Sequence, residues 1–371
     1  MTDDIVARVR ALGELIDGAA IERERRLPRT VVDALIAAGV FKLCVPRVYG
    51  GAQASPLTAL EVLEALGTLD GSVGWCAMVG ITSSLMSVYL EESVAREVYG
   101  PADAITCGVF APMGRAQRDG EGYRVSGRWS FASGCEHSRW RMGGTIAEGD
   151  APLPSGAPDV RSALFTAAQT QVHDTWDTAG LRGTGSHDIS AADVLVPRER
   201  TFSLITDKPR LDGYELPFFG VLASCVAAVG LGIGRAAINT ATSYVRTKSP
   251  PGSKRTLAHR ELTQLQVAGA EARLRAARGL LFDALADALA GPTIEARAHL
   301  RLAACHAATE SAAVTAAMYE LGGGAAVYAK HPLQRQFRDA HVVTHHLMVS
   351  STSLTMAGRA LLGLEIDAAL L

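Results

Sequence analysis

Apolar residues in the first hundred positions recur at the spacing of a helix. Val6, Val9 and Leu12 follow one another at intervals of three, which places them on one helical face. The same spacing returns after Pro28, which can begin a helix because its missing N–H is not needed there. We therefore predict an N-terminal helical domain over residues 1–103.

The period of the pattern changes to two in the middle of the chain. From Tyr123 to Phe131, apolar residues and glycine alternate with arginine and serine, which is typical of a strand with one buried face. Proline, glycine and aspartate are frequent between Glu148 and Asp159, and this composition indicates a surface loop. We predict a small β-domain, a barrel or a sandwich, over residues 104–208.

Helical spacing returns after Leu216 and continues to the end of the chain. Leu274, Leu281 and Leu285 share one stripe of a long helix. The run Ser-Pro-Pro-Gly-Ser-Lys at 249–254 interrupts the pattern and predicts an exposed loop between two long helices. The C-terminal domain, residues 209–371, is predicted to be a four-helix bundle, and the fold class is α+β.

The composition limits the classes of binding partner and the cellular compartment that we expect. With 371 residues, of which 48% are hydrophobic and 20% charged, the chain can bury a large core. Its net charge of −2 gives no reason to expect nucleic acid or a membrane surface as a partner. We recognise no signal peptide and no charge-free apolar run of the roughly 18 residues that a membrane span needs. The six cysteines form no CxxC pair, which favours buried free thiols in a reducing cytoplasm; they are Cys44, Cys76, Cys107, Cys135, Cys225 and Cys305.

Other sequence features that could indicate a binding or catalytic site do not do so here. The run Gly230 to Gly234 has no complete GxGxxG and no predicted strand before it, so helix packing explains it better than a dinucleotide fingerprint. His341, His345 and His346 have no acidic or cysteine partner at ligand spacing, and no metal site is expected. Neither a GxSxG elbow nor a Walker loop occurs in the sequence.

Four segments, in order along the chain, carry a family resemblance. They are Pro46 to Gly51, Asp70 to Trp75, Phe110 to Ala116 together with Gly122 to Gly134, and Trp176 to Ser186. The chain resembles the acyl-CoA dehydrogenase superfamily, and within it the flavin-dependent monooxygenases that form the oxygenase half of two-component hydroxylases. That family uses reduced flavin from a separate NAD(P)H-dependent flavin reductase. It forms a C4a-hydroperoxyflavin with O2 and hydroxylates an aromatic or heteroaromatic small molecule.

The resemblance also assigns roles in the flavin strand. Matching Tyr123 and Gly127 to the family pattern places Phe131 at the aromatic position that covers the flavin. Ser133 then stands at the hydroxyl position near flavin N5, followed by Gly134. A hydroxyl there could donate to a peroxide oxygen on the flavin, so Ser133 is predicted to be catalytic as well as flavin-binding.

The tract that begins at Arg338 lacks the residue that a dehydrogenase needs. The dehydrogenase glutamate falls nine positions after the arginine, where this chain has Leu347, and a leucine cannot accept a proton. The related monooxygenases place a histidine at or beside this position as a base, a role that suits an imidazole with a pKa near ~6.5. We take His346 as the first candidate and His345 as the second. Neighbours on a helix point about 100° apart, so we expect one of them to face the flavin.

Other flavin contacts are implied at a distance from this tract, and from more than one subunit of a homotetramer. Arg246 corresponds to the arginine that holds the flavin pyrophosphate or phosphate, and Gln264 to an adenine-side or pyrophosphate contact. Gly322 and Gly323 would let a dinucleotide of the neighbouring chain approach the backbone. The retention of these glycines favours FAD over FMN.

A substrate pocket is implied by apolar residues beside the matched motifs. Trp75, Phe110 and Met113 are candidate substrate contacts, as is His137, which follows the flavin strand. Residues of these types are more often plain core.

Two further functions remain open. The chain could be an acyl-CoA dehydrogenase or oxidase whose base has moved to another position. It could also be a non-catalytic flavin-binding protein that kept the scaffold after losing the glutamate.

Overall fold

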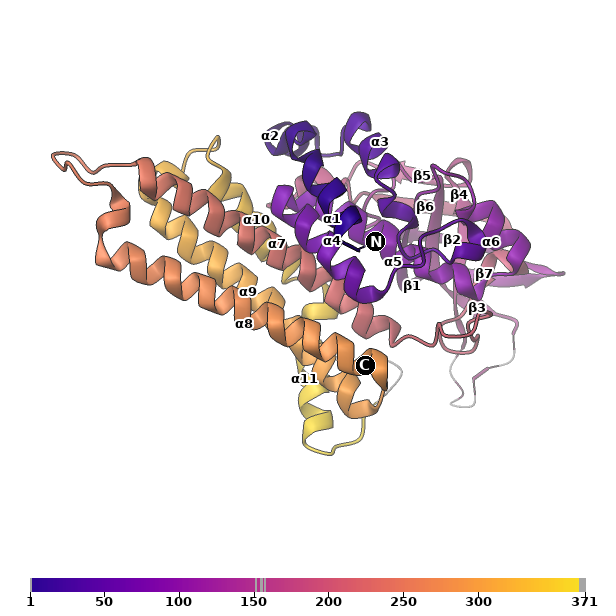
Figure 1. Cartoon of the computed structure of the whole chain (residues 1–371). Helices are drawn as coiled ribbons and strands as arrows, with labels where there is room; N and C mark the ends of the chain where they lie inside the picture. The colour runs from indigo at the N-terminus through magenta and orange to yellow at the C-terminus, as the bar shows by residue number, and fades with distance from the viewer. Residues whose placement is uncertain (1, 151, 154–155, 157, 367–371) are drawn as a thin grey trace.

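The computed structural model describes residues 2–150, 152–153, 156 and 158–366. The chain forms a helical N-terminal part, a mixed sheet, and a bundle of long helices that points away from the sheet (Figure 1). This order confirms the predicted α+β fold class.

Short helices build the N-terminal part. Asp70 separates the last residue of α4 from the first of α5, and its Oδ1 accepts hydrogen bonds from the backbone N–H groups of Ser72 and Val73 at 2.9 and 3.2 Å. This side-chain cap turns the chain sharply between two buried helices. The helices are α1 Thr2–Arg10, α2 Gly18–Glu24, α3 Arg29–Ala37, α4 Pro56–Leu69, α5 Gly71–Ser84 and α6 Glu92–Tyr99.

A single mixed sheet of seven strands follows. Its order is β5-β6-β2-β1-β3-β4-β7, and β1 and β3 pair in parallel while the other pairs are antiparallel. In β2, Tyr123, Val125 and Trp129 are buried and the arginines between them are exposed, as the alternation predicts. The strands are β1 Thr106–Asp119, β2 Gly122–Trp129, β3 Trp140–Glu148, β4 Val160–Thr166, β5 Gln171–His173, β6 Asp188–Pro197 and β7 Thr201–Phe202.

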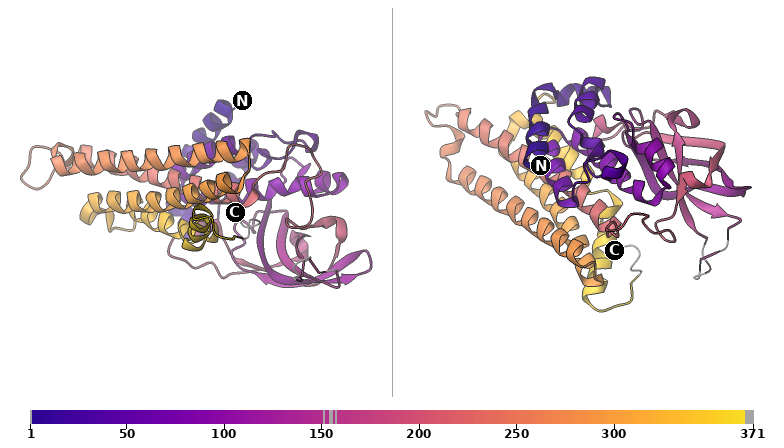
Figure 2. Two further views of the ribbon diagram at one scale, coloured as in Figure 1. Left: turned by 90° about the horizontal axis from the view of Figure 1, so that it is seen from below. Right: turned by 45° about the vertical axis from the view of Figure 1, so that its right-hand side comes forward.

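Long helices form the C-terminal bundle, which Figure 2 shows from two further sides. The predicted breaker at 249–254 lies in the loop between α7 and α8, at the tip farthest from the sheet. The helix α9 contains one non-helical residue, Gly323, at φ 53°. The helices are α7 Phe218–Thr247, α8 Glu261–Ala290, α9 Ile294–Ala326, α10 Pro332–Val343 and α11 Ser351–Leu361.

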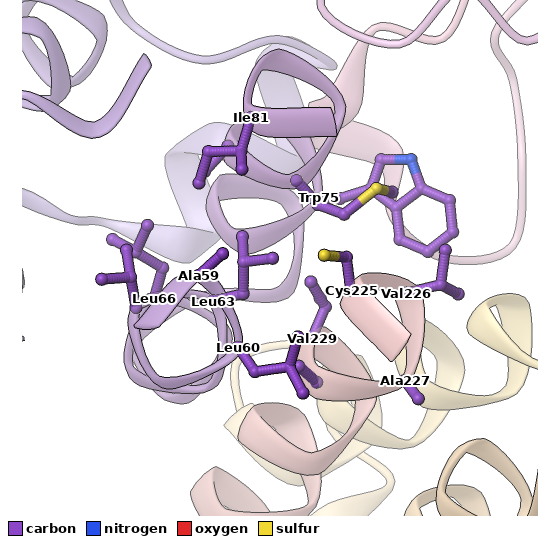
Figure 3. Packing of buried hydrophobic residues seen from close by; sticks show 14 of the residues in the cluster. Ala59, Leu60, Leu63, Leu66, Trp75, Ile81, Cys225, Val226, Ala227 and Val229 are labelled. Atoms are coloured by element: carbon purple, nitrogen blue, oxygen red, sulfur yellow. The ribbon is translucent and has the colours of Figure 1, made fainter. Parts of the chain in front are cut away.

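The core is continuous between the N-terminal helices and the bundle. Figure 3 shows Leu60 and Leu63 of α4 near Val229 of α7, and Trp75 of α5 near Val226 of the same helix. Glycines allow this approach: a Cβ at Gly232 of α7 would lie 2.4 Å from a backbone oxygen of α4. The glycine run 230–234 therefore lies inside a helix and serves packing, as predicted.

One expectation from composition needs correction. Two helical stretches, Gly71–Tyr89 and Phe218–Thr247, are long and apolar enough to cross a membrane by length and composition. In each, 94% of the apolar window is buried inside the protein. A helix that is apolar on all sides is also what the centre of a large core requires.

The six predicted free cysteines are buried.

Candidate active site

A cavity of about 460 Å³ opens where the helical part, the sheet and the bundle meet. The helix α5 supplies one wall, the bulged middle of β1 a second, and the segment from Trp176 to Ser186, called here the 176–186 segment, a third. The start of α7 and the residues after α10 close the remaining side. Segments far apart in the sequence thus meet at one point.

Most of the residues predicted for the site line this cavity. No aspartate or glutamate occurs among the described residues of its wall. Leu347 itself faces the cavity, so a carboxylate has not been supplied from elsewhere on this wall. The predicted residues that line it are Trp75, Phe110, Met113, Phe131, Ser133, His345 and His346.

A larger hollow of about 620 Å³ between α1, α4, α7 and α8 is polar, and two of the three arginines that line it form ion pairs. Arg278 pairs with Glu64 at 2.8 Å, and Arg235 pairs with Glu271 at 2.6 Å. Because these two arginines already have carboxylate partners, this hollow offers less to a charged ligand than its volume implies.

Phe131 combines an unusual backbone with an exposed ring. Its φ is 67°, a region that a residue with a bulky side chain rarely occupies. The side chain is 70% exposed and meets the edge of the Trp176 ring at a centroid distance of 6.1 Å. A strained backbone and an exposed aromatic ring both raise the free energy of the folded chain. Such costs concentrate at functional sites, and a planar ligand on this ring would cover it.

Hydrogen bonds join Ser133 to the opposite wall. The Trp75 indole N–H donates to Ser133 Oγ at 3.0 Å, and Ser133 Oγ lies 2.6 Å from Ser186 Oγ. Ser186 Oγ in turn lies 2.6 Å from Thr184 Oγ1, which donates to the carbonyl oxygen of Leu181 at 2.8 Å. Three hydroxyls thus form one line along the wall.

The 176–186 segment is held in place from α10. The backbone N–H of Leu181, a residue at φ 49°, donates to Asp339 Oδ1 at 2.6 Å. Burial, and to a smaller degree the nearby Asp70, raise the pKa of the Asp339 carboxyl to about 7. The carboxyl that orients this segment therefore titrates near neutrality.

The two neighbouring histidines follow α10 and do not belong to it. The helix ends at Val343, and both side chains line the cavity. The prediction that one of them faces the flavin assumed a helix, but the helix ends before both of them. Which of the two faces the flavin stays a prediction.

Backbone partners give the two rings opposite protonation patterns. His345 Nδ1 lies 2.9 Å from the carbonyl oxygen of His341, which can only accept, so a neutral His345 carries its proton on Nδ1 and has a free lone pair on Nε2. His346 Nδ1 accepts the backbone N–H of Met348 at 3.3 Å, so a neutral His346 carries its proton on Nε2. His345 can accept a hydrogen bond through Nε2, and His346 can donate one.

Burial keeps His346 neutral. Burial, and to a smaller degree the charge of Arg301, lower the pKa of the His346 imidazole to about 4. The ring also meets Trp75 edge-on at 5.5 Å. The expected value near ~6.5 does not apply to this histidine, because burial disfavours its charged form.

Arg301 brings a buried positive charge to the back of the same wall. Its guanidinium donates to the Phe219 carbonyl oxygen at 3.0 Å and to Ser353 Oγ at 2.7 Å. Ser353 Oγ donates in turn to the carbonyl oxygen of Leu347. Among the described residues, no carboxylate lies within ion-pair distance of this arginine. The field in this part of the cavity is therefore positive.

Five predicted residues lie away from the cavity. Arg246 stands in the last turn of α7 and Gln264 in the first turn of α8, and both are exposed. Gly322 and Gly323 lie near the end of α9. The His137 ring packs against the Phe41 ring at 6.4 Å and is not part of the cavity wall.

Sequence reasoning did not single out four residues of the arrangement. Thr184 and Ser186 lie within a segment that carries the family resemblance, and Asp339 follows the matched arginine. The resemblance therefore points to these positions but does not predict their hydrogen bonds. No local pattern indicates that Arg301, in the middle of a helix, is buried beside the site. Groups of three metal-binding side chains do not occur among the described residues.

Two family models match the chain. The N-terminal domain of acyl-CoA dehydrogenase matches residues 8–95, and the C-terminal domain matches residues 224–351. The indole-3-acetate monooxygenase of Pseudomonas putida is 34% identical over 92% of this chain and 89% of that protein. The chain belongs to the acyl-CoA dehydrogenase superfamily, in its flavin-dependent monooxygenase branch.

Further members of this superfamily match along nearly the whole chain. The oxygenase component of the FADH2-dependent resorcinol hydroxylase of Rhizobium sp. strain MTP-10005 is 30% identical over 97% of this chain and 94% of that protein. The structure of XiaF from Streptomyces sp. in complex with FADH2 and glycerol superimposes with a TM-score of 0.88 at 27% identity, covering 98% of this chain and 96% of that one.

Proposed function

We propose that this protein is the oxygenase component of a two-component monooxygenase, which uses reduced flavin and O2 to hydroxylate an aromatic small molecule. The observation that carries the proposal is the pair His345 and His346 beside Leu347, in a cavity wall without a carboxylate among its described residues. The printed names of the relatives, which include an oxygenase component and enzymes for indole-3-acetate and resorcinol, support it.

The cavity fits a flavin ring. Phe131 offers an exposed aromatic face, and Ser133 supplies a buried hydroxyl on the adjoining wall. We propose that these two residues, with the backbone at Gly134, hold the isoalloxazine. Bound reduced flavin would supply the electrons that activate dioxygen. The apolar side chains around it would exclude water from the reacting atoms.

The two histidines take different roles in this proposal. His345, with its free Nε2, accepts the proton of a substrate hydroxyl or ring N–H, and loss of that proton makes the ring more nucleophilic. His346 donates from Nε2 to an oxygen atom in the cavity. The positive field of Arg301 favours the ionised substrate. The first choice of base therefore passes from His346 to His345.

We propose FAD as the flavin and a homotetramer as the assembly. The cavity receives Phe219 from the first turn of α7, whereas Arg246 lies 27 residues later. At 1.5 Å per residue, these positions are about 40 Å apart along the helix. That is more than an extended FAD can bridge, so Arg246 and Gln264 would serve the flavin of a second copy. The α8 residues Leu262 and Leu265, 66% and 70% exposed, support an interface on that helix.

The remaining partners follow from the same function. A separate flavin reductase that uses NAD(P)H would deliver the reduced flavin. We propose a cytoplasmic location, which the six buried free thiols support.

A turnover assay tests the proposed function. The protein would be mixed with FAD, a flavin reductase and NADH, and offered indole-3-acetate or resorcinol as probes of an acidic and a phenolic aromatic. We expect hydroxylated product for at least one aromatic of this class, in excess of hydrogen peroxide. If every aromatic tried gives only peroxide, and acyl-CoA bleaches the oxidised flavin without oxygen, the dehydrogenase alternative replaces this proposal.

A further inference from the structure

Arg301 of α9 is buried behind the part of the cavity wall that the bundle supplies. Its Nη1 donates to the Phe219 carbonyl oxygen at 3.0 Å and to the Met348 sulfur at 3.4 Å, and both of these residues line the cavity. Its Nη2 donates to Ser353 Oγ at 2.7 Å, and Ser353 Oγ donates to the carbonyl oxygen of Leu347, a third lining residue. The guanidinium therefore lies one residue behind the cavity wall.

The hydrogen bonds of Arg301 are incomplete for a buried arginine. A guanidinium has five N–H groups and stays charged in proteins. Nε of Arg301 has no hydrogen-bond partner among the described residues, and the thioether of Met348 is only a weak acceptor. No carboxylate of the described residues is paired with Arg301. A buried charge without a partner is strongly destabilising, so a negative group brought by a ligand would be stabilised here.

Arg141 of β3 shows how this protein satisfies an arginine that serves the fold alone. It is buried, and it too has no ion pair with a described carboxylate. Its Nε and Nη2 donate to the Cys135 carbonyl oxygen at 3.0 and 2.8 Å. Its Nη1 donates to the Ala167 carbonyl oxygen at 3.2 Å and to Thr170 Oγ1 at 2.8 Å. Each nitrogen of Arg141 thus has an oxygen acceptor, whereas Nε of Arg301 has none.

We propose that Arg301 and Met348 form a subsite for the carboxylate of an aromatic acid, in which the Met348 side chain moves aside and leaves Nη1 to the ligand. The cavity would therefore select an aromatic acid over a neutral aromatic of the same shape. The inference rests on the proposed function, since it names the class of substrate that the same cavity takes.

Methionine suits a group that has to move aside. Its side chain has three rotatable bonds, so the thioether can leave Nη1 without a change in the backbone. A carboxylate would then replace a weak acceptor with a charge-assisted hydrogen bond, which is the stronger kind. An acid held from the bundle side leaves Phe131 and Ser133, which follow β2, to the flavin.

The binding of matched acids and amides tests the proposal. Dissociation constants would be measured by equilibrium dialysis on the full-length protein, anaerobically and with excess reduced FAD, so that no turnover occurs. The probes are indole-3-acetate with indole-3-acetamide, and phenylacetate with phenylacetamide. Within each pair the charge differs but the shape hardly does. We expect the wild type to bind at least one acid about tenfold or more tightly than its amide, as a hydrogen bond between charged groups implies.

Four variants separate the charge from the packing. Arg301→Gln should remove the preference by weakening the binding of the acid, while the amide changes little. Arg301→Lys keeps a positive charge and should keep part of the preference. Ser353→Ala removes one partner of the guanidinium but not its charge, so the preference should persist. Met348→Ala removes the side chain that has to move, and should increase the ratio of acid affinity to amide affinity.

The ratio of the two affinities decides the outcome. If Arg301→Gln melts near the wild-type temperature and weakens acid and amide equally, Arg301 has a merely structural role and the inference is wrong. If Arg301→Gln does not fold, Met348→Ala decides, and an unchanged or smaller ratio in that variant overturns the proposal.

The wild type alone can also overturn the inference. Equal affinity for acid and amide in both pairs would do so, as would the absence of binding of all four probes. These results need no turnover, so they leave the oxygenase proposal standing. Failure of the proposed function would show instead as the absence of hydroxylated product from acidic and neutral aromatics alike.

Discussion

At the scale of single residues, hydrogen-bond direction and burial decide the chemistry of this cavity more than residue type does. His345 and His346 are adjacent and chemically identical, yet their Nδ1 atoms have opposite partners. The Nδ1 of His345 donates to a carbonyl oxygen, and the Nδ1 of His346 accepts from a backbone N–H. The first therefore offers an acceptor to the cavity and the second a donor.

The same substitution at the two histidines should have unequal effects. Glutamine keeps an N–H near the Nε2 position but has no basic lone pair there. His345→Gln should lower kcat for a phenolic substrate about 100-fold or more, the usual contribution of a general base. His346→Gln, which retains a donor, should lower it less than about tenfold. Steady-state product formation measures both, and the reverse ranking would restore His346 as the base.

Asp339 should give the protein a recognisable pH dependence. The pKa of its carboxyl is about 7 in the folded chain against an ordinary 3.8. Between these values the folded state binds more protons than the unfolded state, so the free energy of unfolding falls as the pH rises from about 4 to about 7. The contribution of this residue to stability is therefore highest at the acid end of the window.

Asp339→Asn keeps an oxygen for the Leu181 N–H and removes the charge. The stability of the variant relative to wild type should therefore rise between about pH 4 and 7, by at most about 4 kcal/mol for a shift of this size. Urea unfolding at several pH values measures the difference. His346, whose pKa is lowered in the folded state, destabilises both proteins equally as the pH falls, so its effect cancels in the difference. A difference that does not change with pH would show that Asp339 stays ionised in the fold.

At the scale of elements, the 176–186 segment connects the residues that follow β2 to α10. Gly180 is packed directly against that helix: a Cβ there would lie 2.6 Å from the backbone carbonyl carbon and oxygen of Arg338. Backbone atoms cannot move aside as a flexible side chain can.

Gly180→Ala should consequently destabilise the protein by about 1 to 3 kcal/mol and weaken flavin binding. Gly279 is the matched control, because it lies in the exposed middle of α8 and a Cβ there would have no atom within 4 Å. Gly279→Ala should stabilise by about 0.5 to 1 kcal/mol, because alanine favours a helix. Thermal unfolding compares the two, and equal melting temperatures would contradict the close contact at Gly180.

Much of the element pattern could be predicted from the sequence, because periodicity reports which face of each element is buried. The strand at Tyr123, the loop at 249–254 and the long helices after Leu216 all follow this rule. The end of α10 could not be predicted in this way, since no residue near Thr344 indicates that the helix ends before the two histidines. The buried charge of Arg301 and the line of three hydroxyls depend on contacts across more than fifty residues, which no local pattern encodes.

At the scale of the whole molecule, the separation of the predicted flavin residues implies that one chain does not complete the site. Phe131 and Ser133 lie on the cavity wall, while Arg246 is near the far end of a 30-residue helix (Figure 1). A second copy would have to bring its own helix end to this cavity.

Leu265→Glu tests this arrangement. A charge on the exposed α8 face should dissociate the proposed tetramer and weaken FAD binding, although it leaves every cavity residue unchanged. Leu15→Glu, at a site 57% exposed in the N-terminal part, should do neither. Sedimentation velocity and dialysis against FAD measure the two effects. Full FAD affinity in a monomeric Leu265→Glu variant would mean that one chain binds flavin alone.

The most direct measurement of the central claim is the origin of the oxygen atom in the product. The protein, reduced FAD and an aromatic substrate would react under ¹⁸O2 in ordinary water, and mass spectrometry would follow the label. Incorporation of one ¹⁸O atom per molecule of product is the result we predict. Product that carries oxygen from water, or desaturated product without added oxygen, would contradict the assignment of this protein as a flavin-dependent monooxygenase.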